Sequence, residues 1–281
     1  MTLRYFLTLT IIFIMYLPAK GNQVKDGNKL VKTQLLSEMD IVSSGTDFLI
    51  GIKVIPDNGW HTYWINPGDA GLPTVVELKL PENVRSSDVI WEVPDKIPFA
   101  GMANYGYEKE HILLIPIHID DNFNADELLI EANISWLVCK EECIPGSRKQ
   151  SLKLPVKSQA VRNQQIVELF DNLQNRHCKI NDDLKFQAVK TNNEELKLNI
   201  YLPDYLKDLK NLEFYPIEAG FFDNGYKQSL SINGSKAELS LKLDKYRENN
   251  PTEVFGILVS DENLFPTANG KAVIVKAQIE D

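Results

Sequence analysis

The sequence predicts an all-β protein in which two β-sandwich domains are joined by a short helical linker. Many short segments alternate apolar and polar residues, and turn residues separate them at spacings of about 8–12 residues, as in β-sandwiches. Only one segment has the spacing of an amphipathic helix. A chain of 281 residues with 43 % hydrophobic residues can form more than one core. We expect domains at 25–157 and 180–281, with the linker at 158–179.

The first 21 residues have the pattern of a secretory signal peptide. One early cation, Arg4, precedes the apolar run 6–17, and small or polar residues follow at 18–21. The run is shorter than the roughly 20 residues of a membrane-spanning helix, and an uncleaved anchor is the alternative. The pattern therefore predicts an exported protein, in a compartment where disulfides form and persist.

Alternation of apolar and polar residues predicts each strand in turn. In the first domain the segments are 48–55, 74–80, 111–115, 128–134 and 151–156. In the linker, apolar residues between Val161 and Leu173 share roughly one helical face. In the second domain the segments are 184–189, 196–201, 212–216, 237–243, 254–259 and 272–279.

The composition excludes several classes of function. The formal net charge is −9, from 39 acidic and 30 basic residues, whereas a general nucleic-acid binder needs a basic surface. The sequence contains no glycine-rich phosphate loop, no zinc-protease HExxH, no GxSxG and no calcium-binding loop. We therefore expect no nucleic-acid partner, no metal and no small-molecule cofactor.

Two cysteines carry the clearest chemical signal. Cys139 and Cys143 lie four positions apart at the end of an apolar strand, and the following Pro145-Gly146 favours a tight turn. Such a turn can bring two Cα atoms within the roughly 4.4–6.8 Å that a disulfide needs. A bridge over so small a loop stabilises the fold by only about 2 kcal/mol, and strain would make it easier to reduce. The pair is therefore a candidate for a disulfide that opens and closes.

Two alternatives for these cysteines stay open. The bridge can be purely structural, as in many exported proteins. Alternatively, His177 and Cys178 can join the pair in a Cys₃His zinc site, although adjacent residues rarely both face one tetrahedral ion. Without zinc, we expect Cys178 to be a lone, buried thiol.

Aromatic residues concentrate in two turn-rich segments, 59–73 and 99–108. Aromatic loops often mark binding surfaces, so these segments predict a shield or docking surface. Two tryptophans, Trp64 and Trp91, are instead expected in the core. His61 could act as an acid–base group beside a thiol, or be structural. The candidate docking residues are Trp60, His61, Tyr63, Asn104, Tyr105 and Tyr107.

Three segments, 61–73, 104–108 and 136–145, occur in this order and carry a resemblance. Together they resemble the N-terminal domain of the bacterial thiol:disulfide interchange protein DsbD, and more closely its ScsB-type relatives. The resemblance covers about residues 30–156. From residue 184 onward, the chain is similar to the second domain of ScsB-like proteins in general pattern only.

This resemblance implies an immunoglobulin-like periplasmic domain that relays electrons, as in cytochrome c biogenesis. Electrons would come from a thioredoxin-like partner, fed by a membrane-embedded reductase, and pass to periplasmic oxidoreductases. Cys139 and Cys143 match the family's redox pair, with Cys143 as the site of the mixed disulfide. Tyr105 matches an aromatic of a cap loop that covers the disulfide, and Tyr63 flanks the site.

The chain departs from the family pattern in two respects. Its cysteines are spaced CxxxC, closer than in the well-known DsbD domain, and the membrane-spanning and thioredoxin-like parts are not in this sequence. We therefore expect the electron donor and the reductase on separate chains. The expected chemistry is direct thiolate attack through a mixed disulfide. The alternative is a non-catalytic exported binding module with a structural disulfide.

Overall fold

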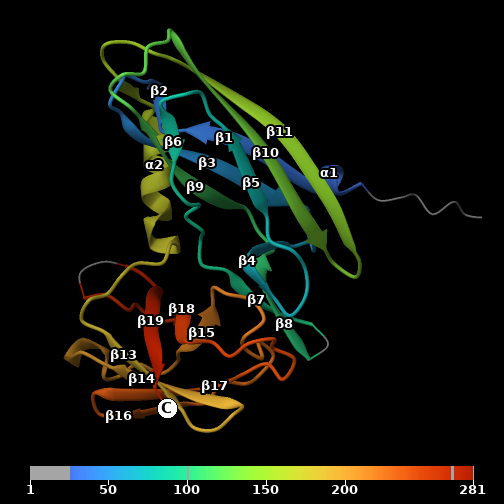
Figure 1. The fold of residues 1–281 in the computed structure, drawn as a ribbon, viewed down its shortest axis with the longest axis vertical. Coiled ribbons are helices and arrows are strands. Elements are labelled where there is room, and N and C mark those ends of the chain that lie inside the picture. The colour runs from blue at the N-terminus through green and yellow to red at the C-terminus, as the bar shows by residue number, and fades with distance from the viewer. Residues whose placement is uncertain (1–25, 100, 267–268, 281) are drawn as a thin grey trace, which may run out of the picture.

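The computed structural model describes residues 26–99, 101–266 and 269–280 (Figure 1). Most of these residues lie in strands, which confirms the all-β fold class. The expected signal peptide lies outside the described residues. Within the described ranges, no helix has both the length and the apolar character needed to cross a membrane.

Two sheets enclose the N-terminal core. One has the order β1-β3-β9-β6 and the other β11-β10-β5. Alternate side chains of both sheets, among them Ile52, Leu113 and Ile130, are fully or almost fully buried between them. The strands are β1 (Val31–Ser37), β3 (Asp47–Pro56), β5 (Val75–Lys79), β6 (Val84–Ser86), β9 (His111–Ile119), β10 (Glu127–Cys139) and β11 (Cys143–Pro155). A short helix, α1 (Gly27–Leu30), precedes β1, and β2 (Met39–Ile41) pairs with β12 (Val161–Arg162).

A third sheet has the order β4-β8-β7 and consists of β4 (Thr62–Gly68), β8 (Met102–Tyr107) and β7 (Asp95–Phe99). It holds most of the two aromatic segments, which the sequence pattern presented as loops. A single bridge between His61 and Cys139 joins its edge to the end of β10. This sheet extends from the disulfide towards the C-terminal half of the chain (Figure 1).

The predicted linker helix is α2 (Gln164–Leu173), followed by the 3₁₀ turn η1 (Gln174–Arg176). The Asn163 side chain caps its first turn by accepting from the backbone N–H of Ile166 at 3.2 Å. Phe170 and Leu173 are buried against Ile112 and other apolar residues on the outer face of the first sheet.

The C-terminal half is one curled sheet of seven strands, in the order β15-β18-β19-β13-β14-β17-β16. Its only parallel pair among the described strands is β13 with β19, and a second hydrophobic core lies inside it. The strands are β13 (Lys185–Lys190), β14 (Glu195–Tyr201), β15 (Glu213–Pro216), β16 (Leu230–Asn233), β17 (Lys236–Lys242), β18 (Glu253–Val259) and β19 (Ala272–Glu280), with the 3₁₀ turn η2 (Asp204–Leu206) after β14.

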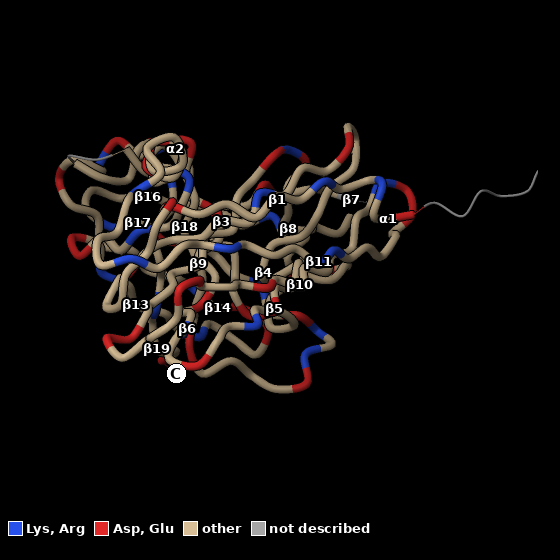
Figure 2. Tube along the Cα trace, turned by 90° about the horizontal axis from the view of Figure 1, so that it is seen from above, with Lys and Arg blue, Asp and Glu red and all other residues tan. Residues whose placement is uncertain are grey.

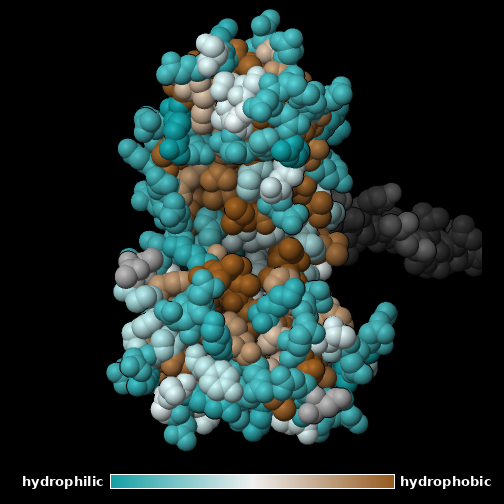
Figure 3. All heavy atoms as spheres, turned by 60° about the vertical axis from the view of Figure 1, so that its left-hand side comes forward, coloured by the Kyte–Doolittle hydropathy of each residue, from teal (hydrophilic) through white to brown (hydrophobic). Residues whose placement is uncertain are grey.

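The two halves meet at the β4-β8-β7 sheet. Tyr105 packs against Tyr215 of β15, with ring centroids 4.7 Å apart. Beside them, the Asn66 side chain donates to the carbonyl oxygen of Pro216 at 2.8 Å. Figure 3 shows hydrophobic residues gathered near the junction of the two halves, on a face that is otherwise largely hydrophilic. Figure 2 shows acidic and basic positions interspersed along the chain, without a continuous basic stripe on the described trace.

Candidate functional site

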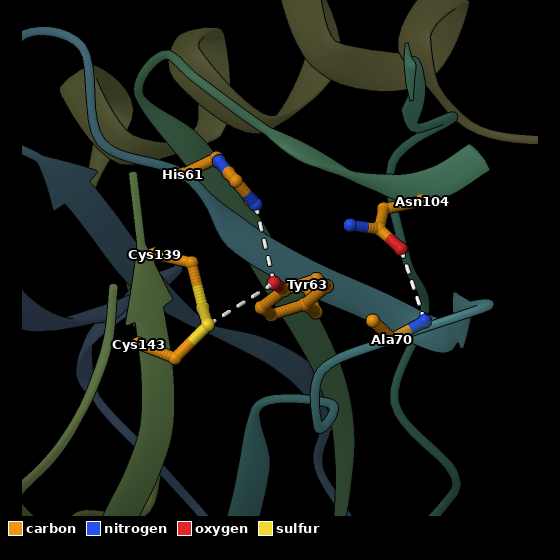
Figure 4. Close-up of a disulfide and its surroundings, with 6 residues drawn as sticks. All are labelled: His61, Tyr63, Ala70, Asn104, Cys139 and Cys143. Atoms are coloured by element: carbon orange, nitrogen blue, oxygen red, sulfur yellow. Dashed lines mark hydrogen bonds between the residues drawn. A yellow bond between two sulfur atoms is a disulfide. The ribbon is translucent and has the colours of Figure 1, made fainter. Parts of the chain in front are cut away.

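The β10–β11 hairpin brings the two cysteines together. Its strands pair from Glu127 with Pro155 to Cys139 with Cys143, with three turn residues between the cysteines. Cys139 exchanges both backbone hydrogen bonds with His61, each at 2.9 Å, so it faces Cys143 as a non-hydrogen-bonded pair. Directly opposite residues in such pairs approach most closely. The Cα atoms are 4.1 Å apart and the sulfur atoms are bonded (Figure 4).

The two sulfur-bearing residues differ in exposure. Cys139 is 2 % exposed, because β4 lies beside it, whereas Cys143 begins the edge strand β11 and is exposed. An incoming thiolate must reach a sulfur atom along the axis of the bond that breaks. Cys143 is therefore the more accessible residue of the pair, and Cys139 is the buried one.

Tyr63 and His61 lie beside the sulfur atom of Cys143, the exposed residue of the pair (Figure 4). The Tyr63 Oη is 3.9 Å from Cys143 Sγ and 3.2 Å from His61 Nε2. Burial raises the pKa of Tyr63 and lowers the pKa of His61, although Glu108 opposes the second effect. Both groups are therefore neutral near pH 7. A neutral His61 with hydrogen on Nε2 donates to Tyr63 Oη, which leaves the phenolic hydrogen for the sulfur.

The loop of residues 66–73 holds the Tyr63 ring in place. Gly71 has φ +100°, and a Cβ there would lie 2.3 Å from the ring, so only glycine fits. The backbone N–H of Ala70 donates to Asn104 Oδ1 at 3.1 Å (Figure 4). Asp69 accepts from Asn224 of the C-terminal half at 2.8 Å.

The six candidate docking residues lie in three different places. His61, Tyr63 and Asn104 form the surroundings of the disulfide described above. Trp60 is buried in the N-terminal core. The remaining two tyrosines lie at the junction of the halves, where the Tyr107 hydroxyl donates to the carbonyl oxygen of Glu92 at 2.6 Å.

Tyr105 occupies a different place from the cap aromatic that the resemblance implied. Consecutive residues of a strand point to opposite faces, so Trp64 and Tyr63 lie on opposite sides of β4. Tyr105 packs on Trp64, at a centroid distance of 6.1 Å, and on Tyr215. It is fully buried. The structure therefore places Tyr105 in the junction and Tyr63 next to the sulfur.

Three further contributors to the site were not found from the sequence: Asp69, Gly71 and Asn224. The turn-rich composition of 66–73 signals a constrained loop, and Gly71 could have been found from it. Nothing local connects Asn224 to this loop, because the contact spans 155 positions of the chain.

The third cysteine lies away from the pair. Cys178 packs with the aromatic residues of the junction, and burial raises the pKa of its thiol to about 12. No three His, Cys, Asp or Glu side chains within the described ranges are grouped as they would be around a metal ion. The sulfur atoms of Cys139 and Cys143 are bonded to each other instead.

Comparison with known proteins gives a family match for the N-terminal part of the chain and a similar fold among solved structures. Residues 28–155 match the family model described as thiol:disulfide interchange protein DsbD, N-terminal. The N-terminal periplasmic domain of ScsB from Proteus mirabilis is 18 % identical, with a TM-score of 0.64, over 90 % of this chain and 95 % of that one. At this identity the likeness shows the fold alone.

The sporulation control protein Spo0M from Bacillus subtilis is 10 % identical over 88 % of this chain and 89 % of that one, with a TM-score of 0.25. This similarity is too low to support an inference about the chain. Comparison with curated proteins found no match. The family match and the bonded cysteine pair agree with the predicted resemblance. Residues 28–155 therefore match the family of DsbD N-terminal domains, a family described by thiol:disulfide interchange, in agreement with the predicted resemblance.

Proposed function

We propose that the protein is a periplasmic thiol–disulfide exchange module that passes electrons between partner oxidoreductases through Cys139 and Cys143. One observation carries this proposal. Within a domain that matches the DsbD N-terminal family, a disulfide joins a buried sulfur-bearing residue to an exposed one at the end of a hairpin. A buried leaving group and an exposed point of attack give the bond a defined direction of opening.

In the proposed exchange, a thiolate of the partner attacks Cys143 Sγ. The bond to Cys139 breaks, and Cys139 Sγ leaves with the electron pair and takes up a proton. A second thiol of the partner then attacks the partner's sulfur in the mixed disulfide and releases Cys143 as a thiolate. The partner leaves oxidised, and the pair has gained two electrons as a dithiol. The reverse sequence delivers those electrons to an acceptor.

Tyr63 supports the step in which Cys143 is released. Its hydroxyl is already 3.9 Å from Cys143 Sγ in the oxidised protein. Donation from a hydroxyl stabilises a thiolate more than a thiol, and so favours Cys143 as a leaving group. His61, on the other side of the hydroxyl, orients this donor.

The proposed partners are other proteins. A thioredoxin-like donor, fed by a membrane-embedded reductase on a separate chain, would reduce the pair, and periplasmic oxidoreductases would accept the electrons. The family supports partners of this chemical class, since thiol:disulfide interchange requires a second thiol protein. The exchange itself uses only sulfur atoms and protons, so the proposal includes no metal or organic cofactor.

A trapping experiment tests the proposal. The Cys139→Ser variant cannot close its own disulfide, so a partner attacked by Cys143 stays attached. We expect adducts from a periplasmic extract that dithiothreitol releases, and none with Cys143→Ser. Both variants carry Cys178→Ser, so that the third thiol adds no background.

The structural alternative gives a different result. Equal adducts from both variants, or none, would count against exchange through Cys143. A reduction potential below about −300 mV would likewise favour a structural bridge.

A further inference from the structure

An apolar groove opens on the hairpin close to the exposed sulfur. Its volume is about 620 Å³, and its walls include Leu72, Pro73, Val75, Leu137 and Pro145. No charged side chain lines it. Leu72 and Val75 are 63 % and 44 % exposed, respectively. Apolar exposure on this scale, concentrated in one concave place, marks an interaction site.

The groove and the disulfide share one face of the hairpin. Side chains two positions apart along a strand point the same way, so Pro145 lies on the face of Cys143 and Leu137 on the face of Cys139. Leu137 and Pro145 are themselves directly opposite each other. The groove therefore begins about 7 Å along the hairpin from the disulfide.

One wall of the groove is held in position before any partner arrives. Leu72 and Pro73 belong to the 66–73 loop, which Asn104 holds from β8 and Asn224 holds from the C-terminal half. A wall that is already ordered loses little conformational freedom on binding. The opposite wall, Leu137 with Pro145, belongs to the paired strands β10 and β11.

We propose that this groove binds an apolar side chain next to the reactive cysteine of the partner. The inference rests on the proposed function and names what the partner must carry. A mixed disulfide fixes the partner's chain at Cys143, so the residues beside its cysteine must lie over this face. A charged side chain would lose its hydration in the groove without gaining a counter-ion, whereas a leucine or phenylalanine side chain gains from burial.

Two peptides test this preference on the full chain. One is the capped peptide Gly-Leu-Cys-Leu-Gly, and the other is Gly-Ser-Cys-Ser-Gly. Each is mixed as the thiol with the oxidised protein, and mass spectrometry follows the mixed disulfide at Cys143. The rate at which each peptide thiol reacts with glutathione disulfide is measured separately. Dividing by this rate corrects for the intrinsic reactivity of the thiol. We expect the apolar peptide to react about tenfold faster, which is the factor for partial burial of one leucine side chain.

Paired variants identify the groove as the cause. Leu72→Ser should reduce the preference to about twofold, because it removes an apolar wall residue that is 63 % exposed. The control is Leu129→Ser, an exposed leucine on the same face of β10 but eight positions from Leu137. This control should keep the full preference.

The outcomes separate this inference from the proposed function. Equal rates for the two peptides would contradict the proposed binding of an apolar side chain in the groove. An equal loss of preference in Leu72→Ser and Leu129→Ser would contradict it as well. Neither result would contradict the proposed thiol–disulfide exchange. If neither the peptides nor dithiothreitol opens the disulfide, the proposed function is wrong and the groove proposal is wrong with it.

Discussion

The hydroxyl of Tyr63 is the polar group of the site that lies within reach of the exposed sulfur and of His61 together. It is 3.9 Å from Cys143 Sγ and 3.2 Å from His61 Nε2, while Gly71 covers the ring. In the oxidised protein this contact is weak, because a disulfide sulfur is a poor acceptor. When Cys143 of the reduced protein is ionised, the same contact becomes charge-assisted.

Replacing Tyr63 with phenylalanine should therefore raise the pKa of Cys143 in the reduced protein. The loss of one hydrogen bond to a charged group corresponds to an increase of about one pKa unit. The measurement is the pH dependence of iodoacetamide alkylation at Cys143, resolved by mass spectrometry.

Tyr105→Phe is the matched control for this variant. The Tyr105 hydroxyl is buried, has no hydrogen-bond partner among the described residues, and faces the junction. This variant should leave the alkylation profile of Cys143 unchanged. If the profile shifts in Tyr105→Phe and not in Tyr63→Phe, the tyrosine that interacts with the Cys143 sulfur is Tyr105 and not Tyr63.

At the scale of elements, the sequence predicted strands well where only one face of a strand is buried. In β10 the residues from Glu127 to Val138 alternate between the core and a more open face, and this alternation is the signal. In β4, Thr62, Tyr63 and Trp64 are all buried, because one side faces the disulfide loop and the other faces the C-terminal half. Alternation vanishes there, and the aromatic stretch resembles a loop.

The same reasoning explains which parts of the site the sequence could supply. The cysteine pair and its turn are local, since the hairpin closes over three residues, and the CxxxC spacing is enough to suggest a bridge. The position of Tyr105 depends on its contact with Tyr215, which lies in the other half of the chain. A contact between residues so far apart in the chain cannot be inferred from the residues that flank Tyr105 in the sequence.

Reduction of the disulfide should cost the fold little. The hairpin is held along its length by paired backbone groups and by the core beneath it, while the bridge closes a very short loop. Dithiothreitol should lower the free energy of unfolding by about 2 kcal/mol or less. Urea unfolding monitored by circular dichroism, with and without the reductant, measures the difference. Loss of the fold on reduction would instead assign the bridge a structural role.

At the scale of the whole molecule, buried histidines lie where the halves join. His111 stacks on Tyr107 with ring centroids 3.9 Å apart, and the backbone of His177 pairs with that of Glu92 in an isolated antiparallel bridge. Burial lowers the pKa of each histidine to about 4. Burial also raises the pKa of Glu92, against the opposing effects of the Ile112 N–H and Arg176.

These shifts predict a loss of stability in mild acid. Between the unfolded histidine pKa near 6.5 and the folded value of about 4, the unfolded chain binds protons that the folded chain does not. Stability therefore falls as the pH falls through this window, by up to about 1.4 kcal/mol per pH unit for each histidine. Glu92 acts in the opposite direction, because its folded form holds a proton more tightly.

The expected measurement is the melting temperature between pH 7 and pH 4. The melting temperature should decline with falling pH. The decline should be less steep in His111→Gln, because the unfolded chain of this variant binds about one proton fewer. A melting temperature that is constant over this range, or equally steep in His111→Gln, would contradict a neutral, buried His111.

Cys178 lies in the same junction as Tyr107. With a pKa of about 12, its thiol stays protonated and shielded at pH 8 while the halves are joined. If the halves part, it meets water and its acidity returns toward that of an ordinary cysteine. The rate at which a maleimide labels this thiol would therefore measure how often the two halves separate at the aromatic junction.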